Sequence, residues 1–150
     1  MKIIKNIFYL IFPLTLGIIS GIITNSNIDY QSLNQPPFAP PSIIFPIVWT
    51  ILYILIGLSY YLYNKNTYAN TTEKIIYYIQ LFLNFTWTII FFTLKLRFLA
   101  IIWILALTIS IYTLITLFIQ KYKTSAYLLI PYFIWCIYAT YLTIGIYLLN

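Results

Sequence analysis

The side chains in this sequence that could do chemistry are mainly aromatic. Phe45, Trp49 and Tyr53 recur at intervals of four residues, so they share one face of a helix. Indole and phenol rings on one face can stack against a flat, apolar ligand. Acid–base catalysis and metal binding are poorly supported, because the sequence has no histidine and only two acids, Asp29 and Glu73.

A second aromatic row includes an amide. Asn84, Trp87 and Phe91 are spaced i, i+3 and i+7, which again places them on one helix face. An asparagine in the middle of an apolar helix is costly when it faces lipid, so Asn84 is expected to face the interior of a bundle. Its amide could bond to a neighbouring helix or contact a ligand.

A third candidate row lies near the C-terminus. Pro131, Trp135 and Ala139 are spaced by four residues, and Pro131 can kink the helix that carries them. A small residue one turn from a tryptophan indicates either tight helix packing or space for a ligand. The single cysteine, Cys136, lies in the same apolar stretch, which favours a packing role.

A proline-rich segment precedes the first aromatic row. Four prolines fall within the seven residues 35–41, and each fixes its own φ and biases the residue before it towards extended geometry. This stiffness predicts a lid loop, residues 25–41, over one end of the site. Two plainer interpretations are a rigid connector and a Pro-x-x-Pro ligand for a partner, formed by Pro37 and Pro40.

Long apolar stretches must position these residues. Of the 150 residues, 63% are hydrophobic and 7% charged, and the mean hydropathy is +0.93. Soluble domains carry about 25% charged residues, so this composition indicates a membrane protein. A spanning helix needs roughly 20 apolar residues, and the runs do not alternate as barrel strands would. The sequence therefore predicts an all-α membrane protein, a single five-helix transmembrane bundle over 1–150. The predicted helices are about 4–24, 42–63, 72–94, 98–120 and 125–148.

The charges are few and unevenly distributed. The formal net charge is +6, and the basic residues fall between the apolar stretches, which favours helix orientation and lipid contact over nucleic-acid binding. Lys95 and Arg97 fall at the lid end of the predicted bundle. Six lysines fall at the other end: Lys2, Lys5, Lys65, Lys74, Lys121 and Lys123. This bias predicts a cytoplasmic N-terminus.

The first apolar stretch is predicted to be a retained helix. No Ala-x-Ala-like cleavage site follows it, although its lysines and apolar run are also found in signal peptides. Gly17 and Gly21 are four residues apart and favour close helix packing. Tyrosines near the helix ends are expected to form interfacial belts: Tyr60, Tyr61, Tyr63, Tyr77, Tyr78, Tyr122 and Tyr127.

These motifs together resemble the TspO/MBR family, the tryptophan-rich sensory and translocator proteins. The matching stretches are Pro36, Phe38–Pro41, Phe45-Pro46, Val48–Tyr53, Leu83-Asn84, Trp87, Phe91-Phe92, Leu128–Tyr132, Trp135 and Ala139–Leu142, in the family's order. The resemblance implies a five-helix bundle that forms a homodimer in a bacterial cytoplasmic membrane. It also implies a pocket near the lid end for porphyrins, haem-related tetrapyrroles, sterols or synthetic aromatic compounds.

Carried over residue by residue, the resemblance implies a ligand-binding set of ten residues. They are Tyr30, Pro40, Trp49, Tyr53, Asn84, Trp87, Phe91, Trp135, Ala139 and Leu142. Trp49 and Trp135 correspond to the tryptophans that the family ties to light-dependent porphyrin breakdown, and would be catalytic if that activity holds.

The chain also departs from the family's pattern. Asp29 stands where a tryptophan usually precedes the loop tyrosine, and Trp103 where many members carry an acid. Thr143 replaces a frequent asparagine. The family's sterol motif is absent, because no basic residue follows Lys123. Sterol binding through that motif is therefore not expected.

Three functions follow as hypotheses. The first is a membrane receptor or sensor that holds a tetrapyrrole by ring stacking, without a required cofactor, since no histidine is present to ligate haem iron. The alternative is an enzyme that degrades porphyrin in light and needs no acid–base pair. Transport of porphyrin or lipid is least favoured, because ion coupling usually needs ionisable groups inside the membrane and no predicted helix carries an acid in its interior, Glu73 being at the edge of the third.

Overall fold

The computed structural model describes residues 2–150, apart from the side chains of residues 2, 3 and 27. Its long helices are α1 (Lys2–Thr24), α2 (Ile44–Thr67), α3 (Thr71–Thr88), α4 (Arg97–Lys121) and α5 (Lys123–Leu149). Short 3₁₀ turns occupy Asn25–Asn27 and Tyr30–Ser32, and a π-helical turn, Ile89–Thr93, extends α3. No strand occurs within the described residues, and all five helices are long and apolar enough to span a membrane. The predicted all-α, five-helix architecture is confirmed.

The predicted third helix, 72–94, is divided in the structure into α3, which ends at Thr88, and the π-helical turn Ile89–Thr93. With that turn counted, the bounds differ from the predicted ones by at most four residues, at the end of α2, which continues past residue 63 to Thr67 through the polar residues Asn64, Lys65 and Asn66. A helix can continue beyond its apolar stretch because its backbone groups are bonded internally. Between α4 and α5 a single residue, Tyr122, makes the connection, so the two helices run antiparallel side by side.

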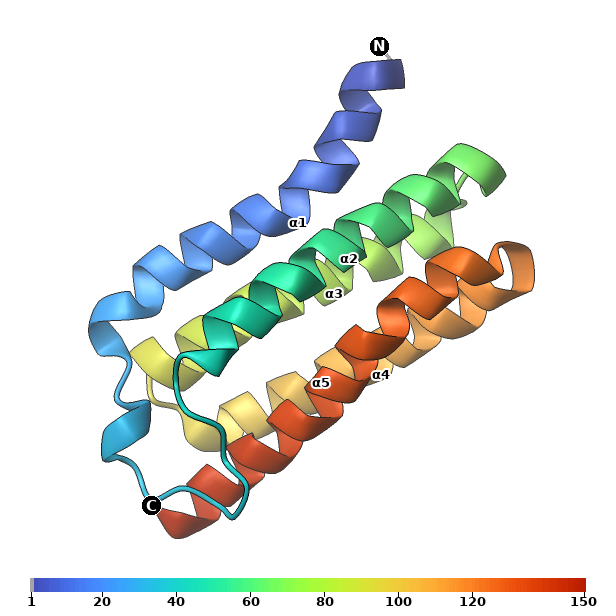
Figure 1. Cartoon of the computed structure of the whole chain (residues 1–150). Helices are drawn as coiled ribbons and strands as arrows, with labels where there is room; N and C mark the ends of the chain where they lie inside the picture. Colours follow the sequence, from blue (N-terminus) through green and yellow to red (C-terminus); the bar gives the residue numbers. More distant parts are fainter. Residues whose placement is uncertain (1) are drawn as a thin grey trace.

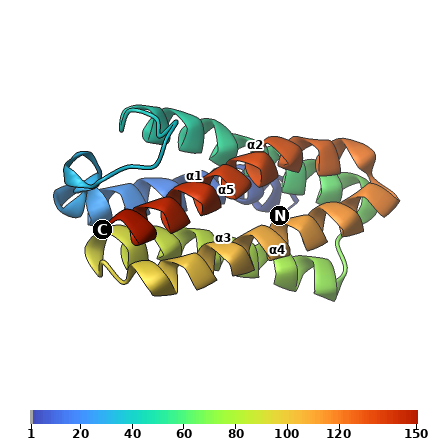
Figure 2. The ribbon, with the colours of Figure 1, turned by 90° about the horizontal axis from the view of Figure 1, so that it is seen from below.

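The helices lie alongside one another, with the lid loop at one end of the bundle (Figures 1 and 2). The opposite end gathers the starts of α1, α3 and α5 and the ends of α2 and α4. The N-terminal half of α1 leans away from the other helices (Figure 1), and Pro13 lies inside this helix. A proline within a helix removes one backbone bond and favours a bend.

Several tyrosines predicted for interfacial belts lie instead in the core. Tyr60, Tyr63 and Tyr77 are each at most 1% exposed. The ring centroids of Tyr60 and Tyr77 stack 3.7 Å apart, and those of Tyr63 and Phe118 are also 3.7 Å apart. The belt prediction was wrong for these three, because ring stacking between helices buries them. Tyr78 and Tyr127 are exposed.

Each acid of the chain ties elements together at one end of the bundle. Asp29, in the lid loop, forms ion pairs with Lys95 at 3.2 Å and Arg97 at 3.3 Å, between α3 and α4. At the opposite end, Glu73 pairs with Lys121 at 2.6 Å. The lid loop is therefore fastened electrostatically to the connection between α3 and α4.

Candidate functional site

A cavity of about 440 Å³ lies beneath the lid loop, between α1, α2 and α3. Its volume falls within the range of about 300–1,000 Å³ found for small-molecule sites. Its lining is mostly apolar, with a few hydroxyl and amide groups. The lining residues are Gly17, Ser20, Gly21, Thr24, Asn25, Ile28, Tyr30, Ser42, Ile43, Phe45, Pro46, Trp49, Tyr53, Trp87, Thr88 and Phe92.

The aromatic row of α2 forms one wall of this cavity. Phe45, Trp49 and Tyr53 all line it, as expected from their shared helix face. The ring centroids of Trp49 and Tyr53 are 5.8 Å apart with planes inclined by 31°. This wall therefore presents neighbouring ring faces and edges to the cavity.

The wall supplied by α3 differs from the predicted row. Trp87 lines the cavity together with Thr88 and Phe92, whereas Phe91 does not. Phe91 is 2% exposed, and its ring stacks against Trp87 with centroids 5.4 Å apart. The π-helical turn Ile89–Thr93 explains the change, because one wider turn alters which side chain follows Trp87 on the inner face.

Two glycines on α1 have different roles. A Cβ built on Gly17 would overlap the Tyr53 ring, so its absence permits close approach of α1 and α2. A Cβ built on Gly21 would meet no atom within 4 Å, and Gly21 lines the cavity. The packing expected from the glycine spacing holds for Gly17, whereas Gly21 leaves space. No α1 residue was predicted from the sequence to belong to the site. The spacing of Gly17 and Gly21 was the one sequence feature that could have indicated that α1 contributes to it.

The lid loop is held from below and from the side. Tyr30 is 3% exposed, its hydroxyl donates to the carbonyl of Pro40 at 3.1 Å, and its ring lies 5.0 Å from that of Phe45. Burial raises the pKa of the Tyr30 phenol above its ordinary value, so the group remains a neutral donor. On the α5 side, the hydroxyls of Tyr138 and Tyr141 donate to loop carbonyls at 2.7 and 2.8 Å. The loop is thus anchored to α5 as well as stiffened by proline.

Asn84 lies in the bundle interior and is 2% exposed. The Tyr53 hydroxyl donates to its Oδ1 at 2.6 Å, and its Nδ2 donates to the Tyr132 hydroxyl at 2.6 Å. Tyr132 donates in turn to Gln80 at 2.9 Å. Of the two alternatives left open for Asn84, the interhelical hydrogen bond is present in the structure. Since Tyr53 also lines the cavity, this hydrogen-bond network fixes the position of an aromatic ring in the cavity wall.

Trp135 stands behind the α2 wall. Its ring centroid is 6.5 Å from that of Trp49, at 89°, and 6.0 Å from that of Phe45. It lines a second hollow of about 490 Å³ between α2 and α5, together with residues including Pro131 and Tyr138. The two tryptophans therefore lie in contact, each next to a different hollow.

The ten residues carried over by resemblance are thus divided between the cavity and its surroundings. Tyr30, Trp49, Tyr53 and Trp87 line it. The others lie outside its lining: Pro40, Asn84, Phe91, Trp135, Ala139 and Leu142. Ala139 and Leu142 are buried within the bundle, at 3% and 4% exposed. No charged side chain lines the cavity among the residues that the structure describes, so binding there rests on shape, stacking and neutral hydrogen bonds.

The positions that depart from the family's pattern also make identifiable contacts. Asp29 makes the ion pairs that fasten the lid loop. The indole of Trp103 donates to the hydroxyl of Thr86 at 2.7 Å and so joins α4 to α3. Thr143 is buried and donates to the carbonyl of Ala139 within α5.

Comparison with known proteins gives consistent matches along the chain. The profile of the TspO/MBR family matches residues 9–149. The chain is 33% identical to the Tryptophan-rich protein TspO of Archaeoglobus fulgidus, over 100% of this chain and 99% of that protein. It is 34% identical to the Tryptophan-rich protein TspO of Bacillus cereus, over 81% of this chain and 80% of the relative. It is 30% identical to a Tryptophan-rich sensory protein of Cereibacter sphaeroides, over 74% and 70% respectively.

Proposed function

Because this chain belongs to the TspO/MBR family, we propose that it is an integral membrane receptor or sensor that binds porphyrins and related tetrapyrroles. The observation that carries the proposal is the lid-covered cavity walled by Trp49, Tyr53 and Trp87. The sensor role is supported by a relative that is itself named a tryptophan-rich sensory protein. A flat, apolar macrocycle suits a cavity whose walls are rings and whose lining carries no charge.

Ring stacking supplies the binding energy in this proposal. Each aromatic contact contributes about 0.5–1.5 kcal/mol beyond area burial, and micromolar binding corresponds to about −8 kcal/mol. Two or three such contacts together with buried apolar area reach that value. Iron plays no essential part and no resident cofactor is required, because the sequence has no histidine and Cys136 is fully buried in α5.

Orientation and assembly complete the proposal. The six lysines at the end opposite the lid loop, against Lys95 and Arg97 at the lid end, favour a cytoplasmic N-terminus in a bacterial cytoplasmic membrane. The side chain of Lys2, one of the six, is outside the described part of the structure. The family resemblance supports a homodimer as the working unit.

The proposal is tested by titrating the purified protein with protoporphyrin and with its iron complex. Binding is read from tryptophan fluorescence and, independently, from porphyrin absorbance. We expect micromolar and equal affinity for the two forms. Trp49→Phe should weaken both by about two- to tenfold, since one ring contact of 0.5–1.5 kcal/mol is reduced. A tenfold preference for the iron form with a shifted Soret band, showing axial ligation, would contradict it.

Light-dependent porphyrin degradation is the second candidate, favoured by the contact between Trp49 and Trp135. Two oxidisable indoles lie 6.5 Å apart, and one of them lines the cavity. In this mechanism the light-excited porphyrin takes one electron from the indole, which gives a porphyrin radical anion and an indole radical cation. The porphyrin radical then adds dioxygen, both oxygen atoms enter the opened macrocycle, and the electron returns to the indole.

Illumination with porphyrin in air distinguishes the two candidates. Since Trp135 lies outside the cavity lining, Trp135→Phe should leave porphyrin affinity within about twofold of wild type, less than one ring contact is worth. If the protein is an enzyme, chromatography should show a porphyrin product with the wild type and none with Trp135→Phe. If it is a receptor, neither the wild type nor the variant should give a protein-dependent product. Product formation that is unchanged in both Trp49→Phe and Trp135→Phe would count against the enzymatic role.

A further inference from the structure

Most of the hydroxyl groups that line the lid-covered cavity have their protons committed within the protein. Each donates to a backbone carbonyl or to an amide oxygen, at distances of 2.6–3.1 Å. A hydroxyl whose proton is used in this way offers only lone pairs to a ligand. The residues concerned are Ser20, Thr24, Tyr30, Tyr53 and Thr88.

A carboxylate would be poorly held inside this cavity. Hydroxyl lone pairs repel the oxygens of a carboxylate, and no charged side chain lines the cavity within the described part of the chain. The indole N–H groups of Trp49 and Trp87 are donors, but they are neutral. Moving an ionised carboxylate out of water without a cation beside it is costly. A ligand with acidic arms should therefore keep those arms outside the interior.

Cations lie just outside the cavity, at its lid end. Asp29 is flanked in the sequence by Ile28 and Tyr30, both of which line the cavity. Lys95 and Arg97 both contact a single oxygen of Asp29, Oδ2, at 3.2 and 3.3 Å. Two cations against one carboxylate leave an excess of positive charge at this rim.

One donor of Arg97 is left over at the rim. Its Nη2 bonds to Asp29, whereas its Nη1 is buried without a hydrogen-bond partner among the described residues, as is the Oδ1 of Asp29. The two side chains therefore do not form the paired bonds of a bidentate fork. The guanidinium lies 5.3 Å from the ring of Phe91, which packs against Trp87 and Phe92 in the cavity wall. Arg97 thus stands one side chain behind that wall.

Lys95 is the more accessible of the two cations. Its side chain is 53% exposed, against 15% for Arg97. Its φ is 55°, in the left-handed region that residues other than glycine rarely adopt. The chain therefore carries a lysine where a glycine would be less strained. An accessible ammonium beside a largely buried guanidinium suits an ionised carboxylate.

We propose that Lys95 and Arg97 form a carboxylate subsite, which holds the acidic arms of a tetrapyrrole whose macrocycle occupies the cavity. The inference rests on the proposed function and adds the orientation of the ligand. The apolar edge of the macrocycle points into the bundle, and the propionate arms leave at the lid-end rim. Asp29 fixes the positions of both cations. Tetrapyrroles with ionised arms are then preferred over neutral ones of the same shape.

The test compares protoporphyrin with its dimethyl ester, which removes both charges and keeps the macrocycle. Each is titrated in the dark into the purified full-length protein and followed by tryptophan fluorescence. The acid should bind about fivefold more tightly than the ester, equivalent to about 1 kcal/mol. Lys95→Gln should bring this ratio to within about twofold of unity, since its ion contact is removed. The ratio is the readout because any loosening of the lid loop affects both ligands alike.

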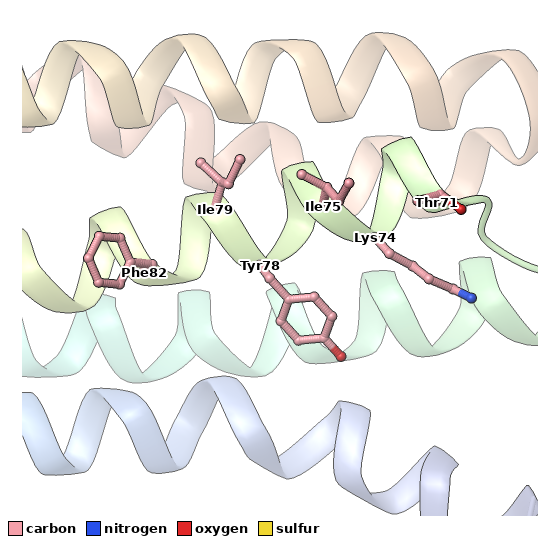
Figure 3. A pocket seen from close by; sticks show the side chains of 6 residues that line it. All are labelled: Thr71, Lys74, Ile75, Tyr78, Ile79 and Phe82. Carbon is pink, nitrogen blue, oxygen red and sulfur yellow. The ribbon is translucent and has the colours of Figure 1, made fainter.

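Lys74→Gln provides the control for a lost positive charge. Lys74 is an exposed lysine beside a surface hollow that is lined by α3 alone, at the end of the bundle opposite the lid loop (Figure 3). This variant should keep the wild-type ratio of acid to ester affinity. A diester with oligoethylene glycol arms tests the orientation separately. It should bind as well as the dimethyl ester, because arms that leave at the rim are not confined.

Equal affinity of the acid and the dimethyl ester for the wild type would overturn the orientation while leaving tetrapyrrole binding in place. An equal loss of the ratio in Lys74→Gln would do the same. Rejection of the bulky diester alone would place the arms inside the cavity and also overturn it. If neither the acid nor the dimethyl ester binds, the proposed function itself fails, and the carboxylate subsite with it.

Discussion

Gly21→Phe is expected to abolish porphyrin binding in the cavity while the helix bundle stays folded. A side chain at this position meets no atom within 4 Å of its Cβ and enters the cavity that Gly21 lines. Gly21 lies in the last turn of α1, so replacing this glycine changes helix propensity by less than the roughly 1 kcal/mol of an interior position and does not oppose the helix. We expect at least a tenfold rise in the porphyrin Kd, equivalent to about 1.4 kcal/mol. Fluorescence titration and thermal unfolding in detergent measure the two effects.

Gly17→Ala is the matched control, one helical turn earlier on α1. Its new Cβ would overlap the Tyr53 ring, so this variant should lower the unfolding temperature. The two glycine variants therefore predict opposite patterns: lost binding with retained stability at Gly21, and lost stability at Gly17. Wild-type affinity in Gly21→Phe would place the ligand elsewhere, for example in the hollow beside Trp135.

The parts of the site that follow from a regular helix could be predicted from the sequence. Length and apolarity identify five spans, and the four-residue spacing of Phe45, Trp49 and Tyr53 survives in α2 because that stretch is an unbroken α-helix. The prediction for the aromatic row on α3 was right for Trp87 and wrong for Phe91. Its i, i+7 step assumes continuous α geometry, and the π-helical turn replaces Phe91 with Phe92 at the cavity wall.

The remaining features depend on contacts between helices, which spacing within one helix does not encode. Gly17 and Gly21 form a single motif in the sequence, yet one is pressed against Tyr53 and the other faces empty space. Likewise, Tyr60 and Tyr77 have the position of belt residues, and contacts between helices bury them: their mutual stacking, and the edge-to-face contact of Tyr9 with Tyr60. Each of these outcomes is set by the partner helix.

Removal of Glu73 should produce the largest loss of stability among the charged residues. Its side chain is 2% exposed, and it accepts from Lys121 at 2.6 Å, from the Tyr63 hydroxyl at 2.8 Å and from the backbone of Asn70 at 2.8 Å. These bonds join α2, α3 and α4. Breaking a buried charge pair by removing one partner costs about 3–5 kcal/mol, and Glu73→Ala also leaves the buried Tyr63 hydroxyl without this acceptor. Because Lys121 can reach water, we expect a value of about 3 kcal/mol.

Asp29→Ala is the natural comparison, because Asp29 is the chain's other acid. Its side chain is 24% exposed and that of Lys95 is 53% exposed, so screening limits the pair to about 1 kcal/mol. Unfolding free energies in mixed micelles should therefore fall about three times further for Glu73→Ala. Since Asp29 fastens the lid loop, its removal should instead speed porphyrin dissociation, measured by stopped-flow fluorescence. Equal destabilisation by the two variants would contradict the prediction that the buried Glu73 pair stabilises the fold more than the partly exposed Asp29 pairs. Unchanged porphyrin dissociation in Asp29→Ala would show that the Asp29 pairs do not hold the lid loop.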